Sequence, residues 1–220
     1  MNGRAFPVAE SQLPLCAEFH DGTFVRGESQ IAAAGRRIRR VWIEPDDPLP
    51  CPGVVEVIAS ADALVLGPGS LYTSIVPNLL VPGVAEAIRQ ASGVKIFVCN
   101  LMTQPGETDG FSASDHLRAL EAYLGPGVVQ VCLVHNRPIA RTSWNGGEPV
   151  SCDLHRIASL GTAPMGADLI GQGFRIRHDA AKLGRLVVAV VQGRSEHVWN
   201  HRIHRAQGSF IAADRWSEAA

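Results

Sequence analysis

The stretch Ala63-Leu-Val-Leu-Gly-Pro-Gly-Ser-Leu-Tyr-Thr-Ser-Ile-Val-Pro-Asn78 decides the fold that we predict for this chain. Its first four residues are apolar, and the glycine-bearing turn Gly67-Pro-Gly-Ser70 follows at once, which is typical of a buried strand that ends in a tight loop. Glycine permits a positive φ and a close approach of the backbone, so that N–H groups can converge on an anion. Because open α/β sheets bind ligands where such strands end, we expect a site for a phosphorylated, nucleotide-like ligand here.

The sequence beyond this stretch continues as a βαβ unit. Residues 84–91 predict a helix, which Pro82 can open, and the apolar run Val94–Cys99 predicts a second buried strand. Upstream, the apolar residues between Val54 and Ile58 indicate a short helix that leads into the first strand. Strands joined in this way run parallel, and the crossover between them is right-handed.

The same pattern is repeated once more along the chain. A polar loop after the second strand leads to a helix over residues 115–124, with Ser112 or Ser114 as its N-cap and Gly125 after its end. Residues 128–134 form a third hydrophobic strand. We therefore predict an α/β, Rossmann-like fold with a mainly parallel sheet flanked by helices.

The N-terminal part has a different, antiparallel pattern. Asp21-Gly22 favours a type I′ hairpin turn between strands over residues 15–19 and 23–26. Residues 37–43 alternate apolar and basic side chains, which indicates a strand with one face in water. We therefore expect an antiparallel hairpin near the N-terminus.

The C-terminal part is less regular in sequence. We assign no order to the elements within residues 135–161. Asp179 can cap a helix over residues 180–191, although the valines there also suit a strand. We divide the chain into an α/β domain over residues 1–195 and a C-terminal tail over residues 196–220.

The composition of the 220-residue chain excludes several classes of protein. A formal net charge of −1 offers no electrostatic attraction to nucleic acid or to an anionic membrane, and no apolar run reaches the length of a membrane span. The five cysteines form no C-x-x-C pair, so neither a disulfide framework nor structural zinc is predicted, and a cytoplasmic location is expected. We also expect a homo-oligomer.

Polar side chains gather in the two loops that follow the first and second predicted parallel strands. Such loops lie side by side at one edge of a parallel sheet. Each loop alone would be consistent with a plain turn, because glycine, proline, asparagine and serine are common in turns. Two such loops at adjacent strand ends favour a ligand site. The candidate ligand-binding residues are Gly67, Gly69, Ser70, Tyr72, Thr73, Asn78, Asn100, Gln104, Gly106, Glu107, Thr108 and Asp109.

Several kinds of chemistry are consistent with these loops. Glu107 and Asp109 can ligate a magnesium ion that carries a diphosphate, orient a ligand hydroxyl, or merely cap the next helix. The turn Gly67–Ser70 is neither a P-loop nor a nucleophile elbow, and no nearby base would activate its serine. His116 falls within a predicted helix and is interpreted as structural. We therefore assign neither a catalytic residue nor a metal ligand.

Three histidines near the C-terminus have helical spacing. His197, His201 and His204 stand at i, i+4 and i+7, which would let them share one face of a helix. The H-E-x-x-H pattern of metalloproteases is missing, and Trp199 lies among them. An exposed helix face is therefore favoured over a metal patch, and the three histidines are given no role.

Five segments together resemble one known family. They are Asp21–Ser29, Arg39–Pro45, Gly67–Val81, Asn100–His116 and Arg177–Asp179. Their residues, and most of all those of the two long segments, closely resemble the gluconeogenesis factor family. That family is YvcK-like and is related to 2-phospho-L-lactate transferase, the CofD-like enzymes of deazaflavin cofactor synthesis. The resemblance covers most of the chain.

The resemblance implies a Rossmann-like, CofD-like fold with a pocket for a nucleotide or a nucleotide-sugar. For the regulator branch of the family it implies UDP-sugar binding and support of cell shape and cell-wall growth on gluconeogenic carbon sources. For the enzyme branch it implies transfer of a phospholactyl group from a nucleotide donor to a deazaflavin, with magnesium. Tyr-Thr-Ser-Ile at residues 72–75 and Pro-Gly-Glu-Thr-Asp-Gly at residues 105–110 resemble the regulator branch, so a non-catalytic binding regulator is expected.

One feature of the family is not matched. Its members begin with a strand and a Gly-Gly-Gly-Thr-Gly type loop, whereas residues 1–8 already resemble the middle of a family sequence. The resemblance therefore implies an α/β domain that is N-terminally incomplete and lacks the first nucleotide-binding loop. A sheet without its first strand exposes an edge and apolar faces, so reduced ligand affinity and reduced stability are expected.

Overall fold

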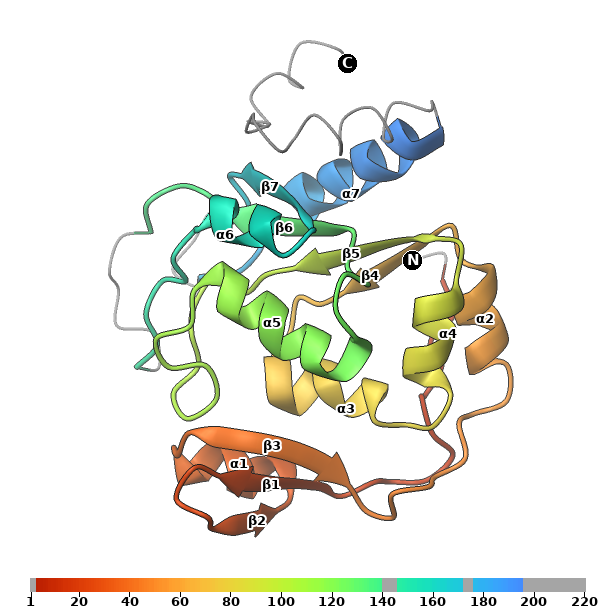
Figure 1. Cartoon of the computed structure of the whole chain (residues 1–220), viewed down its shortest axis with the longest axis vertical. Helices are drawn as coiled ribbons and strands as arrows, with labels where there is room; N and C mark the ends of the chain where they lie inside the picture. Colours follow the sequence, from red (N-terminus) through yellow and green to blue (C-terminus); the bar gives the residue numbers. More distant parts are fainter. Residues whose placement is uncertain (1–2, 140–145, 172–175, 196–220) are drawn as a thin grey trace.

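The centre of the fold is a four-stranded parallel sheet in the order β4-β5-β6-β7 (Figure 1). The computed structural model describes residues 3–139, 146–171 and 176–195. The parallel strands are β4 (Ala63–Leu66), β5 (Val94–Val98), β6 (Val131–His135) and β7 (Ala163–Ala167). Helices lie on both faces of this sheet, so the predicted Rossmann-like α/β architecture is confirmed.

β4 is less buried than its apolar sequence predicts. It pairs with β5, with Ala63 opposite Val94, and its residues are half-buried or exposed. Val65 keeps 44% of its surface exposed, whereas every residue of β5 is buried. The reason is position: among the described strands β4 stands at the edge of the sheet, so one of its sides has no neighbouring strand.

The two faces of the parallel sheet bury two separate sets of side chains. Alternation along β5 directs Phe97 to one face and Ile96 and Val98 to the other. α7 (Ala180–Ser195) covers the opposite face, which Ile96 and Val98 reach. This segment is therefore a helix and not the strand that its valines would also suit. The helices on the Phe97 side are α2 (Val54–Ser60), the π-helical turn Leu71–Ile75 that continues into α3 (Val76–Leu79), α4 (Val84–Gln90), α5 (Ala113–Leu124) and α6 (Leu154–Ser159).

A three-stranded antiparallel sheet in the order β2-β1-β3 precedes the parallel one. It consists of β1 (Leu15–Phe19), β2 (Phe24–Arg26) and β3 (Ile38–Ile43), with α1 (Glu28–Ala34) between β2 and β3. The predicted hairpin is confirmed, but its turn is not type I′. The Phe19 carbonyl accepts a 3.0 Å hydrogen bond from the Gly22 N–H, which makes His20 and Asp21 the central residues of the turn. The Asp21 carboxylate also accepts from the Thr23 N–H at 3.0 Å, and this bond stabilises the longer loop.

Both predicted helix starts are confirmed. Ser112, rather than Ser114, is the N-cap of α5. Its side chain accepts from the Asp115 N–H, and the Asp115 carboxylate accepts from the Ser112 N–H, which completes a capping box. At the start of α7 the Asp179 carboxylate accepts a 2.9 Å hydrogen bond from the Lys182 N–H. Local side-chain chemistry therefore sets where these two helices begin.

No single helix in the described part of the chain is long and apolar enough to cross a membrane. Among the described residues one bent pair of helices, Leu71–Leu79 and Val84–Gln90, which meet at 79°, has the length and composition of a span. Leu71 and Val84 belong to the buried core on the Phe97 side of the sheet. The predicted tail over residues 196–220, with its three spaced histidines, lies outside the described residues.

Candidate functional site

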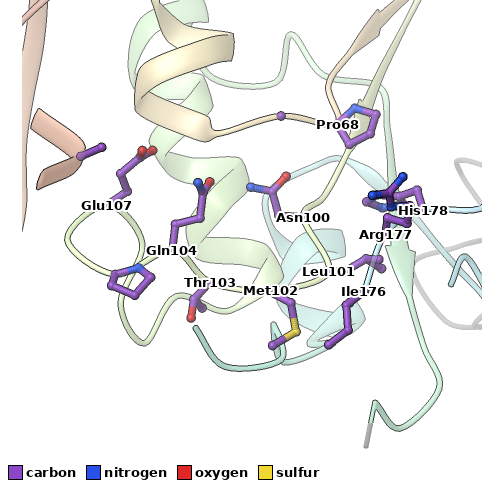
Figure 2. A pocket seen from close by; sticks show the side chains of 13 residues that line it. Pro68, Asn100, Leu101, Met102, Thr103, Gln104, Glu107, Ile176, Arg177 and His178 are labelled. Carbon is purple, nitrogen blue, oxygen red and sulfur yellow. The ribbon is translucent and has the colours of Figure 1, made fainter. Parts of the chain in front are cut away.

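A pocket of about 430 Å³ opens where β4 and β5 end, and small-ligand sites commonly measure roughly 300–1,000 Å³. Four segments line it: the turn after β4, the loop after β5, α1, and the residues just before α7 (Figure 2). This is the edge of the sheet at which α/β folds bind ligands. The lining residues are Ala32, Pro68, Gly69, Asn100, Leu101, Met102, Thr103, Gln104, Pro105, Glu107, Ile176, Arg177 and His178.

The two polar loops lie side by side, as the sequence predicts. The side-chain amide of Gln104 donates a 2.8 Å hydrogen bond to the Ser70 hydroxyl. The Glu107 carboxylate accepts from the Tyr72 N–H at 3.2 Å and from the Thr73 hydroxyl at 2.9 Å. These hydrogen bonds fasten the loop after β5 to the segment after β4.

Glu107 is the anion that the N–H groups after the glycine turn contact. Only 5% of its surface is exposed, and burial raises the pKa of its carboxyl group, while the hydrogen bonds from Thr73 and Tyr72 act in the opposite direction. A carboxylate is favourable there because N–H groups at the start of a helix lack intrahelical partners. A protein carboxylate therefore binds the start of the helical segment that follows the glycine turn.

Two glycines are required by close approaches of the backbone. Gly67 has a φ of 85°, and a Cβ atom there would lie 3.1 Å from the Val98 carbonyl oxygen on the neighbouring strand. Gly106 has a φ of 84°, and a Cβ atom there would lie 2.9 Å from the backbone of Gly35, just after α1. The Gly106 carbonyl also accepts from the Ile38 N–H at 3.1 Å. These contacts hold the two loops against the parallel sheet and the antiparallel sheet.

The predicted site residues divide into those that line the pocket and those behind it. The pocket is lined by Gly69, Asn100, Gln104 and Glu107. Those that support the lining from outside are Gly67, Ser70, Tyr72, Thr73, Gly106, Thr108 and Asp109. Asn78 does neither. It is exposed on α3, where its amide donates a 2.6 Å hydrogen bond to the Ser74 carbonyl, because the expected loop is helical from Leu71 onward.

Comparison with known proteins places this fold and pocket in a family. A sequence profile described as "2-phospho-L-lactate transferase CofD" matches residues 1–170. The chain belongs to the CofD family. The family resemblance noted in the sequence is thereby confirmed.

Curated relatives of this CofD-family chain carry the name gluconeogenesis factor. One from Halalkalibacterium halodurans is 42% identical over 200 residues, which cover 88% of this chain and 61% of the relative. One from Bacillus subtilis is 37% identical over 198 residues, which cover 87% of this chain and 62% of the relative. The chain thus spans about three fifths of the length of these relatives.

A solved structure supports the same assignment. The crystal structure of a Bacillus halodurans protein matches this CofD-family chain with a TM-score of 0.81 and 43% sequence identity. The match covers 84% of this chain and 62% of the crystallised one. A CofD-like fold is therefore confirmed for the described residues.

Arg177 and His178 are pocket residues that the sequence did not assign to the site. An antiparallel bridge between Ile170 and His178 positions them: the Gly171 N–H donates to the Arg177 carbonyl at 2.9 Å, and the Asp179 N–H donates to the Leu169 carbonyl at 2.8 Å. In the described part of the chain the exposed Arg177 guanidinium has no hydrogen-bond or ion-pair partner. Burial lowers the pKa of His178, and its Nε2 atom has no hydrogen-bond partner among the described residues. The segment Arg177–Asp179 carried a signal only as part of the family resemblance.

The acidic residues beside this CofD-family pocket do not by themselves form a metal site in the described part of the chain. Within the described ranges, no group of three or more His, Cys, Asp and Glu residues is arranged to hold a metal. Both Glu107 oxygens accept hydrogen bonds from protein donors, and Asp109 accepts from the Gly106 N–H at 2.6 Å without lining the pocket. Neither residue caps α5, because Ser112 and Asp115 do so. The two carboxylates instead organise the loop after β5.

Proposed function

We propose that this CofD-family chain binds a nucleotide-sugar of the UDP-sugar class and acts as a regulator of cell shape and cell-wall growth on gluconeogenic carbon sources. The observation that carries the proposal is the Arg177 guanidinium, which lines the pocket without a partner among the described residues. The name gluconeogenesis factor, carried by the curated relatives, supports the physiological part of the proposal.

Arg177 has the chemistry to bind the diphosphate of such a ligand. A guanidinium is always charged, and its N–H groups form a planar fork that matches two phosphate oxygens. No carboxylate in the described part of the chain competes for it. Burial lowers the pKa of the neighbouring His178, so that imidazole is neutral around pH 7 and the positive charge of this wall comes from Arg177.

The remaining polar groups of the pocket suit the uncharged parts of a nucleotide-sugar. The Asn100 amide has no hydrogen-bond partner in the described part of the chain, and Gln104 uses its nitrogen to bond Ser70 and keeps its oxygen as an acceptor. Amide groups both donate and accept, as sugar hydroxyls do. A ligand with phosphate at one end and hydroxyls at the other therefore matches the pocket.

A transferase that moves a phospholactyl group onto a deazaflavin is the second candidate, and the description of the family favours it. Magnesium usually binds a nucleotide donor through one or two carboxylates together with the phosphates. Among the described lining residues Glu107 is the single carboxylate, and each of its oxygens already accepts a hydrogen bond from a protein donor. A binding role needs no metal ligands, so regulatory binding is the first candidate.

Calorimetric titration with UDP-N-acetylglucosamine tests the proposal. We expect saturable heat from the full chain. Arg177→Ala should weaken the affinity by about tenfold or more, since a charge-assisted contact to phosphate is lost. Arg26→Ala is the matched control, because it removes an exposed arginine that pairs with Glu44 and does not line the pocket. This control should bind as the unaltered chain does.

A parallel assay with a guanosine donor, a deazaflavin and magnesium tests the second candidate. Turnover would establish the transferase and overturn the regulatory proposal. An absence of heat with UDP-N-acetylglucosamine would overturn it as well. Equal losses of affinity in Arg177→Ala and Arg26→Ala would show that Arg177 does not bind the phosphates of the ligand.

A further inference from the structure

The pocket has a negative end and a positive end. Glu107 lies at one end beside α1, and Arg177 lies at the other (Figure 2). Burial and, to a smaller extent, the charge of Glu28 in the first turn of α1 raise the pKa of Glu107, so a second carboxylate acts on this end. Asn100 and Gln104 lie between the two ends in this view. A ligand therefore meets opposite charges at its two ends.

Hydrogen bonds fix the Glu107 carboxylate in place at its end of the pocket. Its Oε2 atom accepts from the Tyr72 N–H at 3.2 Å, and its Oε1 atom accepts from the Thr73 hydroxyl at 2.9 Å. Each carboxylate oxygen can accept more than one hydrogen bond, so acceptor capacity is left for a ligand. A ligand group that reaches this end therefore gains by donating a hydrogen bond and loses by carrying a negative charge.

The lining between the two ends suits a pyranose ring better than a nucleobase. None of the described lining residues is Phe, Tyr or Trp, so a uracil ring finds no such side chain on which to stack. Asn100, Gln104 and Glu107 instead offer planar polar groups, which match neighbouring hydroxyls. With the diphosphate at Arg177, the sugar then extends toward Glu107 and the uridine extends away from it.

We propose that Glu107 is a specificity-determining residue, which admits nucleotide-sugars with a neutral hexose and rejects those whose sugar carries a carboxylate. This inference rests on the proposed function, because it takes the nucleotide-sugar and its contact with Arg177 as given. A sugar carboxylate at this end would lose its water beside a like charge. The selection works through repulsion of the wrong ligand rather than through an added attraction to the right one.

The test compares UDP-glucose with UDP-glucuronic acid, which differ in whether the sugar ends in a hydroxymethyl group or a carboxylate. In calorimetric titrations of the full chain at neutral pH, UDP-glucose should bind about tenfold more tightly or better. Glu107→Gln keeps the shape of the side chain and removes its charge, so UDP-glucuronic acid should gain affinity and the ratio should approach one. Glu86→Gln makes the same chemical change at an exposed carboxylate on α4 that does not line the pocket, and it should leave the ratio unchanged.

The possible results separate this inference from the function on which it rests. Equal affinities of the unaltered chain for the two ligands would overturn the role of Glu107 and leave nucleotide-sugar binding standing. If Glu107→Gln still binds both ligands and the ratio of their affinities is unchanged, the role of Glu107 is likewise overturned and nucleotide-sugar binding stands. Binding of neither ligand would overturn the proposed function itself. The ratio in the unaltered chain needs no variant, so it can refute the role of Glu107 even if Glu107→Gln fails to fold.

Discussion

The Glu107 carboxylate accepts a 3.2 Å hydrogen bond from the backbone N–H of Tyr72, a residue 35 positions earlier in the chain. The bond joins the loop after β5 to the first turn of the helical segment after β4. The same carboxylate accepts from the Thr73 hydroxyl. One buried acidic side chain therefore fixes the separation of the two loops that form the pocket.

Replacement of Glu107 by alanine should destabilise the protein. The Tyr72 N–H and the Thr73 hydroxyl would lose their acceptor, and each such loss at a buried site costs about 1–3 kcal/mol. Glu107→Gln keeps one acceptor oxygen and should cost less. Urea denaturation measures the free energy of unfolding. Glu86→Ala, which breaks an exposed ion pair with Arg89, is the control and should change stability by no more than about 0.5 kcal/mol. Equal losses in Glu107→Ala and Glu86→Ala would contradict the bridging role.

Replacement of Gly106 by alanine should disturb the pocket as well as the fold. The new Cβ atom would lie 2.9 Å from the Gly35 backbone, at a φ of 84° that alanine rarely adopts. We expect a loss of about 1–3 kcal/mol from the backbone conformation and a further loss from the clash. Gly110→Ala is the matched control, because Gly110 also has a positive φ but faces open space. Urea denaturation gives the free energy of unfolding of both variants, and the difference between them measures the clash with Gly35. Equal free energies would show that the clash costs nothing.

Replacement of Ser112 by alanine should weaken the start of α5. The variant removes the side chain that accepts from the Asp115 N–H, and loss of such an N-cap costs about 0.5–2 kcal/mol. Ser159→Ala removes a serine hydroxyl near the end of α6 that contacts only a local carbonyl, and it should be nearly neutral. Thermal or urea denaturation compares them. Matching stabilities of the two variants would show that the capping box does not contribute to the fold.

Several parts of the structure could be predicted from the sequence. The Ser112 cap, the strand before Gly67 and the helix after Asp179 follow from patterns a few residues long, because hydrogen bonds and alternation within such short segments are local. The order of parallel strands follows in turn, since a βαβ unit leaves few ways to connect them. The placement of the two loops at one edge of the sheet was predictable for this reason.

The rest depends on contacts between residues far apart in the sequence. Arg177 reaches the pocket because its segment pairs with Leu169–Gly171, and no short sequence pattern predicts that pairing. The sequence predicts a loop position for Glu107, but it does not predict that the Glu107 carboxylate accepts hydrogen bonds from Tyr72 and Thr73. The sequence predicts a loop at Asn78, whereas the structure has this residue exposed on α3 because a π-helical turn begins at Leu71. Polar residues that are close together in the sequence can thus lie on different surfaces of the folded protein.

Two buried histidines and one half-buried histidine should make the stability of the chain depend on pH below neutrality. Burial lowers the pKa of His116, His135 and His178 below the ordinary histidine value of about 6.5. As the pH falls below that value, the unfolded chain binds protons that the folded chain does not. Each histidine then reduces the free energy of unfolding by up to about 1.4 kcal/mol per pH unit. Glu107 and Glu121, whose pKa values burial raises, act in the opposite direction, so a single histidine must be isolated by substitution.

His116→Gln isolates one of these contributions. His116 is fully buried on α5 and its Nδ1 atom donates a 2.9 Å hydrogen bond to the Ser112 carbonyl, which a glutamine amide can replace without titrating. Between about pH 7 and about pH 5.5, the free energy of unfolding should fall by about 1 kcal/mol less in the variant than in the unaltered chain. Leu117→Ala destabilises the same helix without removing a titratable group, so it should keep the pH dependence of the unaltered chain. Urea denaturation at each pH gives the comparison. Parallel pH curves for His116→Gln and the unaltered chain would mean that His116 binds its proton equally well in the folded and unfolded states.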